Sequence, residues 1–409
     1  MINRNIKKRI VDSLKLKEVT IIIGARQVGK TTILKDIISD LANAGEHTLY
    51  FNLDIEEDSK YFVSQQRLLS KIELEVDNKK AYIFIDEIQQ KENAGKFLKG
   101  LYDMNLPYKF VVTGSGSLEL KEKISEALTG RKYLIEMSSV SFSEFINFKT
   151  SYKYEKKINN FFELEKEKVS LLLDEYLTFG GYPAVITAET TKRKKEIINE
   201  IFTSYITKDI SFLLGVRYPD KFIKLIKLLA IQSGSIVNYS QLTQDIGIRA
   251  ETLKTFLWYA EQTYIISIIK PYYTNLKKEL TKSPTIYFND LGMLNFSRNT
   301  FANIQYDGMV FQNFIYTILK EKYDNGLSKI NYWRTKDKAE VDFIVNIENG
   351  IMPIEVKYKN LKRNEVTRSF RSFISKYKPK EGLFVNLNYS NYIDIESTKV
   401  TFLPFWELF

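Results

Sequence analysis

Eight residues near the amino terminus carry the strongest chemical signal in the chain. The stretch GARQVGKT, residues 24–31, matches the pattern G-x-x-x-x-G-K-[ST]. In such a loop the glycines let backbone N–H groups curl around phosphate oxygens, and the positive end of the following helix adds to the attraction. The pattern therefore predicts a site for the phosphates of a nucleotide. The alternative is a plain glycine turn before a helix.

The side chains of this loop suggest a division of roles. Lys30 would reach the β- and γ-phosphates, and the hydroxyl of Thr31 would hold Mg²⁺. The residues expected to contact the nucleotide are Gly24, Ala25, Arg26, Gln27, Val28, Gly29, Lys30, Thr31 and Thr32.

Two adjacent carboxylates supply the expected partner of the loop. In YIFIDE, residues 82–87, four largely apolar positions place Asp86 and Glu87 at the carboxyl end of a strand. Ligands bind at that end of the strands in parallel α/β sheets. Asp86 would hold Mg²⁺ through water, and Glu87 would orient and polarise the attacking water. The alternative is that both carboxylates cap a helix.

A third set of charged residues lies near the carboxyl end, in KAEVDFIVNIENGIMPIEVKYKN, residues 338–360. Asp342 sits inside one apolar run, and Glu355 and Lys357 sit inside the next. Unpaired buried charges are costly. Acidic groups on adjoining strands can hold a divalent metal that activates water, and Lys357 would share the face of Glu355. The alternative is the solvated face of an edge strand.

Strands and helices alternate through the first 145 residues and would position the first two sets. Apolar runs predict strands, and helical spacing predicts helices between them. Such alternation implies a parallel sheet with helices on both faces. The predicted strands are 19–23, 48–54, 81–89, 109–115 and 132–138, and the predicted helices are 31–45, 59–76, 94–104 and 118–128.

The order of these parts resembles the AAA+ class of P-loop ATPases. One strand–helix unit separates the phosphate-loop strand from the strand of Asp86, and Glu87 follows directly. In that class the next strand ends in a residue that senses the γ-phosphate, and the resemblance gives this role to Thr113 or Ser115. It also implies ATP as the nucleotide and Mg²⁺ as its cofactor. The catalytic residues so implied are Lys30, Asp86, Glu87, Ser115 and Arg131.

Arg131 stands just before the fifth predicted strand, where AAA+ proteins usually carry an arginine finger. Such a finger stabilises transition-state charge in a neighbouring subunit. This role would therefore require a homo-oligomer. The alternative is an ordinary exposed arginine.

The middle of the chain predicts two further parts. Residues 146–235 look helical, with a tight turn at Gly180, Gly181 and Pro183, and predict a helical lid that closes on nucleotide. Residues 238–273 predict a helix, a glycine-containing turn, a second helix and a strand, which resembles a winged helix-turn-helix.

The second helix of that segment leaves two interpretations open. One side could face a DNA major groove, whereas the other side is typical of packing and favours a structural or protein-docking module. The residues of the first side are Arg249, Glu251, Thr252 and Lys254, and those of the second are Leu253, Phe256, Leu257 and Tyr259.

The pattern of Asp342 followed by Glu355-x-Lys357 resembles the PD-(D/E)XK nuclease core. With the phrases GGYP, YITKDI, YFNDLG and YWRT…EVDF, nearly the whole chain resembles a large prokaryotic family of predicted AAA+ ATPases with a C-terminal PD-(D/E)XK-like domain of unknown function. The resemblance implies an α/β fold in four parts. These are a P-loop ATPase domain (1–145), a helical lid (146–235), a winged helix (236–300) and a PD-(D/E)XK-like domain (301–409).

One position departs from that family. Its helix before the strand pair begins with Gly, then a few residues, then Glu and Asn, and that Glu completes the acidic cluster. Here Gln312 takes the place of the Glu. Metal affinity falls when a ligand loses its charge, so Asp342 and Glu355, with Lys357, form either a weakened nuclease site or a degenerate core that binds nucleic acid or protein.

The composition bounds these hypotheses. The net charge is +10, of which +2 lies up to residue 150 and +8 after it. This distribution hints at nucleic acid, although a bias toward Lys, Ile and Asn would also produce it. With no Cys and one His, disulfides, thiol chemistry and His-rich metal sites are excluded. No apolar run approaches the ~18 residues of a membrane span, so we expect a cytoplasmic protein with no membrane contact.

Three functions follow as alternatives. The first is an ATP-hydrolysing AAA+ switch whose C-terminal module engages DNA or a protein partner. The second is a metal-dependent DNA nuclease regulated by ATP. The third is a nucleotide-binding switch with little turnover.

Overall fold

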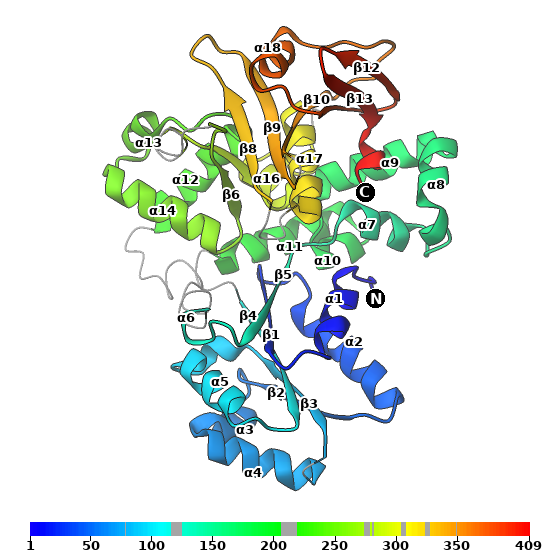
Figure 1. The fold of residues 1–409 in the computed structure, drawn as a ribbon. Coiled ribbons are helices and arrows are strands. Elements are labelled where there is room, and N and C mark those ends of the chain that lie inside the picture. Colours follow the sequence, from blue (N-terminus) through cyan, green and yellow to red (C-terminus); the bar gives the residue numbers. More distant parts are fainter. Residues whose placement is uncertain are drawn as a thin grey trace.

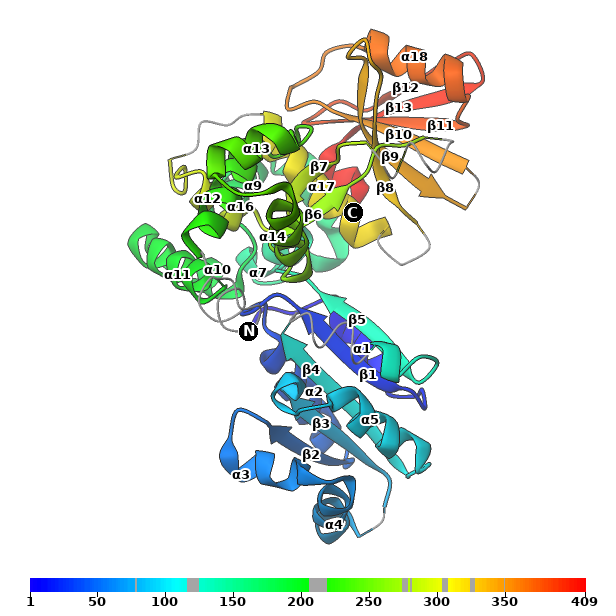
Figure 2. The same cartoon turned by 90° about the vertical axis from the view of Figure 1, so that its left-hand side faces the viewer.

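The computed structural model describes residues 1–77, 79–115, 125–205, 219–273, 279, 282–303, 308–323, 328–348 and 350–409. Along the chain, an amino-terminal α/β unit is followed by a helical middle and then by a second sheet with its helices (Figure 1). The helical middle lies between the two sheets in both views (Figures 1 and 2).

The amino-terminal unit is built on a five-stranded parallel sheet with the order β2-β3-β4-β1-β5. The prediction of a parallel sheet is confirmed. Because β4 lies between β1 and β3, the carboxyl ends of these three strands meet at one edge. The strands are β1 (Val19–Gly24), β2 (His47–Asn52), β3 (Ala81–Asp86), β4 (Tyr108–Ser115) and β5 (Lys132–Met137).

Helices cover both faces of this sheet, as predicted (Figure 1). Strands β1 and β3 are buried along their whole length, which explains their unbroken apolar sequences. One helix pair packs together on one face and another on the opposite face. The first pair is α1 (Ile6–Ser13) and α2 (Lys30–Asn43), and the second is α4 (Gln65–Val76) and α5 (Ala94–Asp103).

The predicted single helix over 59–76 is wrong. The segment divides into α3 (Glu56–Ser59), the 3₁₀ turn η1 (Lys60–Val63) and α4. Ser64 is the reason, because its backbone is extended and its side chain caps α4 by accepting a hydrogen bond from the N–H of Arg67. Of the predicted helix 118–128, only α6 (Ser125–Ala127) lies in the described residues.

The helical middle begins directly after β5. It contains six helices among the described residues up to 231: α7 (Phe142–Lys149), α8 (Ile158–Leu164), α9 (Lys166–Phe179), α10 (Pro183–Thr187), α11 (Thr191–Ser204) and α12 (Pro219–Ile231). A 3₁₀ turn, η4 (Glu155–Lys157), precedes α8, and the tight turn predicted at Gly180 separates α9 from α10. The phrase YITKDI falls mostly on 206–210, outside the described residues.

The next segment contains the helix, turn, helix and strand expected over 238–273. These are α13 (Tyr239–Ile246), α14 (Ala250–Gln262) and β6 (Ile266–Ile269), and β6 pairs in antiparallel fashion with β7 (Thr285–Phe288). On α14, Leu253, Phe256 and Leu257 are buried, as the packing interpretation predicts. The short helix α16 (Leu291–Ser297) leads into the last unit.

A six-stranded mixed sheet with the order β12-β13-β11-β10-β9-β8 forms the carboxyl-terminal unit. Its elements are α17 (Gly308–Tyr323), β8 (Ile330–Arg334), β9 (Glu340–Ile347), β10 (Gly350–Val356), α18 (Arg368–Tyr377), β11 (Glu381–Asn386), β12 (Asn391–Ile395), β13 (Thr398–Pro404) and η6 (Phe405–Leu408). The predicted pair of strands is thus three strands, because a turn at 335–339 splits the first run into β8 and β9.

A β-bulge breaks the pairing of β8 with β9 next to the charged residue of interest. The register passes from Asn331↔Ile344 to Trp333↔Val341, so two residues of β9, Asp342 and Phe343, oppose one residue of β8. Bulges re-aim side chains and are frequent beside functional sites.

The apolar core runs through most of the molecule. One cluster extends from Ile2, through the strands of the first sheet and the helical middle, to Leu408 at the end of the chain. A second cluster lies under α18, between that helix and the second sheet. The chain therefore packs as connected layers that share one main core.

Candidate functional site

The loop between β1 and α2 has the backbone that the glycine pattern predicts. Gln27 and Gly29 have φ values of 58° and 99°, in the left-handed region. At Gly24 a β-carbon would lie 2.1 Å from the carbonyl oxygen of Met137 on β5, so only glycine fits beside that strand. The loop is therefore held in a tight curve at the carboxyl edge of the sheet.

Lys30 begins α2 and its side chain lies inside this curve. Its ammonium donates hydrogen bonds to the carbonyl oxygens of Gly24 at 3.0 Å and Ala25 at 2.7 Å. The residue is only 6% exposed. The positive charge thus stands where the loop surrounds it, next to the amino terminus of a 14-residue helix.

Asp86, at the end of β3, is fully buried and accepts three hydroxyl hydrogen bonds. Thr31 Oγ1 donates to its Oδ2 at 2.6 Å, and Tyr50 Oη donates to the same oxygen at 3.0 Å. The hydroxyl of Thr113 donates to Oδ1. The structure therefore brings Thr31 and Asp86, the two residues predicted to hold Mg²⁺, into direct contact.

Glu87 follows Asp86 with a left-handed backbone, φ 57°. Its backbone N–H lies 3.2 Å from Asp86 Oδ1, and its carboxylate accepts a hydrogen bond from the amide of Gln89. Burial raises the pKa of Glu87 above its ordinary value of 4.5, although Lys30 and Gln89 act in the opposite direction. The carboxylate thus lies in an enclosed site near a positive charge.

The two candidate sensor positions differ in the structure. Thr113 lies on β4, between the strands of Lys30's loop and of Asp86, and its hydroxyl is buried against Asp86. Ser115 ends the same strand, but its side chain lies outside the described residues. Of the two, Thr113 is the one that the structure places in the cluster.

Arg131 lies at the opposite edge of the sheet. Its carbonyl accepts a hydrogen bond from the N–H of Val19, the first residue of β1, whereas the phosphate loop follows the last residue of that strand. Its guanidinium forms an ion pair with Asp103 at 2.8 Å. Arg131 is thus remote from the phosphate loop of its own chain. It could approach a phosphate loop only in a second copy of the chain.

The carboxyl-terminal charged residues also converge. Gln312, on α17, donates to Asp342 Oδ1 at 2.9 Å, and the backbone N–H of Val356 donates to Oδ2 at 2.7 Å. Lys357 pairs with Glu355 Oε1 at 2.8 Å, while Glu355 Oε2 is buried with no hydrogen-bond partner among the described residues. The predicted set of Asp342, Glu355, Lys357 and Gln312 therefore forms one cluster.

The electrostatics of this cluster favour protonation or pairing. Burial, followed by the charge of Glu355, raises the pKa of Asp342 to about 7. Burial alone would lower the pKa of Lys357, but the carboxylate of Glu355 raises it above its ordinary value. Within the described residues, no group of three or more His, Asp or Glu side chains could hold a metal ion.

Comparisons with known proteins bear on both clusters. Residues 16–146 match the family model of an AAA domain. The chain carries an AAA domain. Residues 170–303 and 307–408 match two domains of unknown function, DUF8612 and DUF4143.

Several uncharacterized proteins are similar to this chain over most of its length. One from Methanocaldococcus jannaschii is 26% identical and aligns over 100% of this chain and 90% of its own. One from Haemophilus influenzae is 24% identical over 95% and 94%, and one from Mycobacterium bovis is 23% identical over 90% and 76%.

Two solved structures share a distant likeness. Cdc6p from Pyrobaculum aerophilum has a TM-score of 0.29 and 10% identity, over 74% of this chain and 95% of that one. A structure on katanin self-assembly has a TM-score of 0.26 and 16% identity, over 36% and 56%. Likeness of this degree carries no functional argument.

The sequence did not predict the role of Arg4, which lies outside the phosphate loop and links it by hydrogen bonds to the segment after β5 and to α7. Its guanidinium donates to the carbonyl of Val28 in the loop at 2.8 Å and to that of Ser138, just after β5, at 2.7 Å. It also pairs with Glu144 at 2.9 Å, the residue that completes the capping box of α7. Nothing local in the sequence signals these contacts, which span up to 140 residues.

A cavity of about 210 Å³ opens beside the same loop. Its walls are mostly apolar and come from the amino-terminal segment, from α2 and from α10. The wall residues include Ile2, Gly29, Thr32, Ile33 and Pro183. The helical middle therefore reaches the phosphate loop through Pro183 and its neighbours.

Two sequence phrases that no single role explained, GGYP and YFNDLG, meet in one joint. Asp290 accepts hydrogen bonds from the N–H groups of Gly181 at 2.8 Å and Met293 at 3.0 Å. A β-carbon on Gly180 would lie 2.2 Å from the backbone nitrogen of Gly292. Gly180 and Gly292 are thus both required by a close backbone approach between the turn after α9 and the start of α16.

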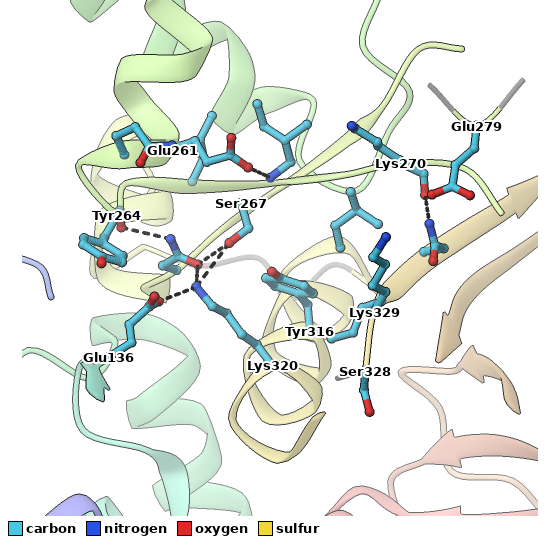
Figure 3. Close-up of a pocket in the computed structure, with 17 residues that line it drawn as sticks. Glu136, Glu261, Tyr264, Ser267, Lys270, Glu279, Tyr316, Lys320, Ser328 and Lys329 are labelled. Carbon is cyan, nitrogen blue, oxygen red and sulfur yellow. Dashed lines mark hydrogen bonds and ion pairs between the residues drawn. The ribbon is translucent and has the colours of Figure 1, made fainter. Parts of the chain in front are cut away.

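A polar cleft of about 410 Å³ lies between the segment of α14 and β6 and the segment of α17 and β8, with Glu136 of the AAA domain at one side (Figure 3). Lys320 of α17 crosses it and pairs with Glu136 of β5 at 3.2 Å. Lys320 also lies 3.2 Å from Asn289 Oδ1. The helix that carries Gln312 at its start therefore contacts the AAA sheet near its end.

Among the described residues, no helix combines the length and apolar character needed to cross a membrane.

Proposed function

We propose that this protein is a Mg²⁺-dependent ATP hydrolase. The observation that carries the proposal is the contact between Thr31 and Asp86, directly beside Lys30 and the phosphate loop. A hydroxyl and a carboxylate are oxygen donors of the kind that Mg²⁺ prefers. The donor set therefore fits the metal, and Mg²⁺, when bound, would neutralise charge on the phosphate oxygens.

The protein's own residues then have distinct roles. Lys30 exchanges its two carbonyl partners for β- and γ-phosphate oxygens. Glu87 orients the attacking water and takes its proton, so that ATP and water yield ADP and phosphate. Thr113 and Tyr50 hold Asp86 in place through their hydroxyl groups.

We also assign the nucleoside to the 210 Å³ cavity beside the loop. The cavity adjoins Gly29 and Thr32, as a base attached to phosphates in the loop requires. Apolar walls from Ile33 and Pro183 suit a purine ring. In this assignment the segment 146–235 acts as a lid, because α10 supplies one wall, and Arg131 serves only a neighbouring chain.

Steady-state phosphate release tests the proposal. The wild-type protein should hydrolyse ATP in Mg²⁺, Lys30→Ala should lose turnover together with affinity, and Glu87→Gln should bind ATP while turnover falls at least tenfold. Turnover that survives Lys30→Ala would overturn the assignment of the loop. Tight binding with no turnover in the wild type would leave the nucleotide-binding switch as the function.

For the carboxyl-terminal cluster we propose a degenerate, non-cutting core, in place of a nuclease. Gln312 occupies Oδ1 of Asp342, where a metal would otherwise bind. Within the part of this cluster that the structure describes, Glu355 Oε2 is the one buried oxygen without a partner that a cation could satisfy. Incubation of the protein with several DNA substrates in Mg²⁺ or Mn²⁺ should leave them intact; cleavage that Asp342→Ala abolishes would restore the nuclease alternative.

The segment 236–300 keeps the winged-helix assignment as part of this proposal, with α14 as a packing element. Its inward residues are buried, and the charged residues exposed along its other side and at its start are Arg249, Glu251 and Lys254. One acidic and two basic groups are a weak match to DNA phosphates.

A further inference from the structure

Positive charge is concentrated in one segment of the carboxyl-terminal unit. Residues 357–380 contain nine Lys and Arg and a single acidic residue, Glu365, which gives this segment +8 of the chain's +10. All other residues together contribute only +2. A composition bias spread along the chain does not explain this distribution.

The helix in this segment, α18, separates its residues sharply. Phe370, Phe373 and Ile374 are buried against the second sheet. Arg368, Arg371 and Lys376 are exposed, and at 100° per residue they fall on the opposite side of the helix. The exposed residues between them, Ser372 and Ser375, are small, so a partner can approach the helix closely.

The loop before α18 extends the same charge. Leu361 is only 3% exposed and anchors the loop. The next two residues, Lys362 and Arg363, are exposed. Glu365 is shared between Lys359 at 3.2 Å and Arg363 at 3.7 Å. One carboxylate thus faces several cations, and the segment keeps a large surplus.

Among the residues that the structure describes, most of this charge has no acidic partner in an ion pair. None of the ion pairs of the described residues includes Lys362, Arg368, Arg371 or Lys376. One acidic residue outside the segment does reach the helix, because Glu396, in the turn between β12 and β13, accepts a hydrogen bond from Ser375.

Folding does not account for the arginines at the start of α18. The first turn of a helix is its positive end, where cations are unfavourable and acidic side chains are preferred. The first turn of α18 has no acidic residue and contains Arg368 and Arg371. These charges cost the helix some stability, which an anionic partner would offset.

We propose that this surface binds the phosphate backbone of nucleic acid. The surface consists of Lys362, Arg363, Arg368, Arg371 and Lys376. At ~1.5 Å per residue α18 is about 15 Å long, which matches several phosphates of a duplex at one charge per ~1.7 Å of its axis. Contacts of this kind position a protein on nucleic acid without reading sequence.

An acidic protein is the less suitable partner for this surface. Stable protein interfaces are built around buried aromatic or apolar anchors. The exposed side of α18 offers only serines and long cations, and its aromatic residues face the core. This composition suits a hydrated polyanion.

Fluorescence anisotropy with a labelled DNA duplex of about 25 base pairs and arbitrary sequence tests the proposal, over about 50 to 200 mM salt. The full chain is used in EDTA without nucleotide, so the result does not depend on ATP hydrolysis. The test variant is Arg368→Gln, Arg371→Gln and Lys376→Gln together. The matched control is Lys192→Gln, Arg193→Gln and Lys195→Gln on α11, which removes the same charge from another exposed surface.

Wild type and control should bind the duplex with a steep salt dependence. The α18 variant should bind at least tenfold more weakly at about 100 mM salt, with a salt slope smaller by about two to three. Circular dichroism should show unchanged helix content, since each removed residue is exposed. Equal loss in both variants, an unaffected α18 variant, or wild-type protein that ignores duplex, single strands and RNA but binds a polyglutamate peptide would each overturn the proposal.

Discussion

Beneath the phosphate loop a single carboxylate accepts hydrogen bonds from three hydroxyl groups, one on a helix and two on strands. Asp86 contacts Thr31 from α2, Tyr50 from β2 and Thr113 from β4. An unpaired charge at this depth would be costly, and three donors satisfy it. The arrangement fixes the carboxylate where a metal beside the phosphates would need it.

The titration of Glu87 gives the first prediction at this scale. Its pKa is raised by burial above the ordinary 4.5, and a general base must be ionised to take a proton. Turnover should therefore be lost as the pH falls through this raised pKa, so the acidic limb of the kcat profile should lie above pH 4.5.

The measurement is the pH–rate profile of phosphate release at saturating Mg·ATP. As a control, nucleotide binding should persist across the same acidic range, because the backbone N–H groups of the loop do not titrate there. An acidic limb at or below the ordinary glutamate value would contradict the role of Glu87 as base.

At the scale of elements, the local sequence predicted the individual elements better than it predicted the contacts between them. The glycine loop, the strand that ends in Asp86 and the paired carboxylates of the last sheet were all predictable, because each depends on neighbours in sequence. The split of one predicted helix depended on a single cap, Ser64. The bulge that re-aims Asp342 could not be predicted, since it arises from pairing between two strands.

Contacts between distant segments were beyond the sequence for the same reason. Arg4 meets Glu144, and Asp290 meets Gly181, across more than 100 residues. Both are ordinary residues in their local context. Arg4 finds its partner where the start of α7 packs beside the phosphate loop, and Asp290 finds its partner where α16 packs against the turn after α9.

The joint at Gly180 gives the prediction at this scale. Gly180→Ala should destabilise the protein by about 3 kcal/mol or more, because the new methyl would meet the backbone of Gly292 at 2.2 Å in addition to the strain of a positive φ. Thermal melting would show this as a clear fall in Tm.

Gly247→Ala is the control for a positive φ without a clash. Gly247 has a φ of +72° and a ψ of 49°, in the left-handed helical region, whereas Gly180 combines a φ of +73° with a ψ of −165°. A β-carbon on Gly247 would meet nothing within 4 Å. It should cost only about 1 kcal/mol. If the two substitutions lower Tm equally, backbone strain alone explains the need for glycine at 180. The close approach to Gly292 would then contribute nothing to stability.

At the scale of the whole molecule, the end of the chain returns to the helical middle. Trp406 stacks on Phe162 of α8 with ring centroids 5.8 Å apart, and Phe405 packs on Phe142 of α7 at 5.9 Å. The carboxyl-terminal unit is therefore continuous with the core that also contains the AAA sheet.

This continuity predicts cooperative unfolding. Trp406→Ala should destabilise the chain by about 3 to 5 kcal/mol, since a buried aromatic side chain is lost, and calorimetry should show one transition at lower temperature. Leu164→Ala, on α8 but 80% exposed, should change little. Two separate transitions, of which the one at higher temperature is unaltered by Trp406→Ala, would show that the units fold independently.

The central claim is that the loop at residues 24–31 binds the phosphates of ATP, and calorimetric titration of Mg·ATP tests it most directly. The wild-type protein should give a saturable binding heat with one nucleotide per chain. Lys30→Ala should lose that binding heat. Its Tm without nucleotide should stay close to that of the wild type, because the substitution removes only two hydrogen bonds to the loop. A wild-type protein that gives no binding heat, or a Lys30→Ala protein that binds as the wild type does, would contradict the account.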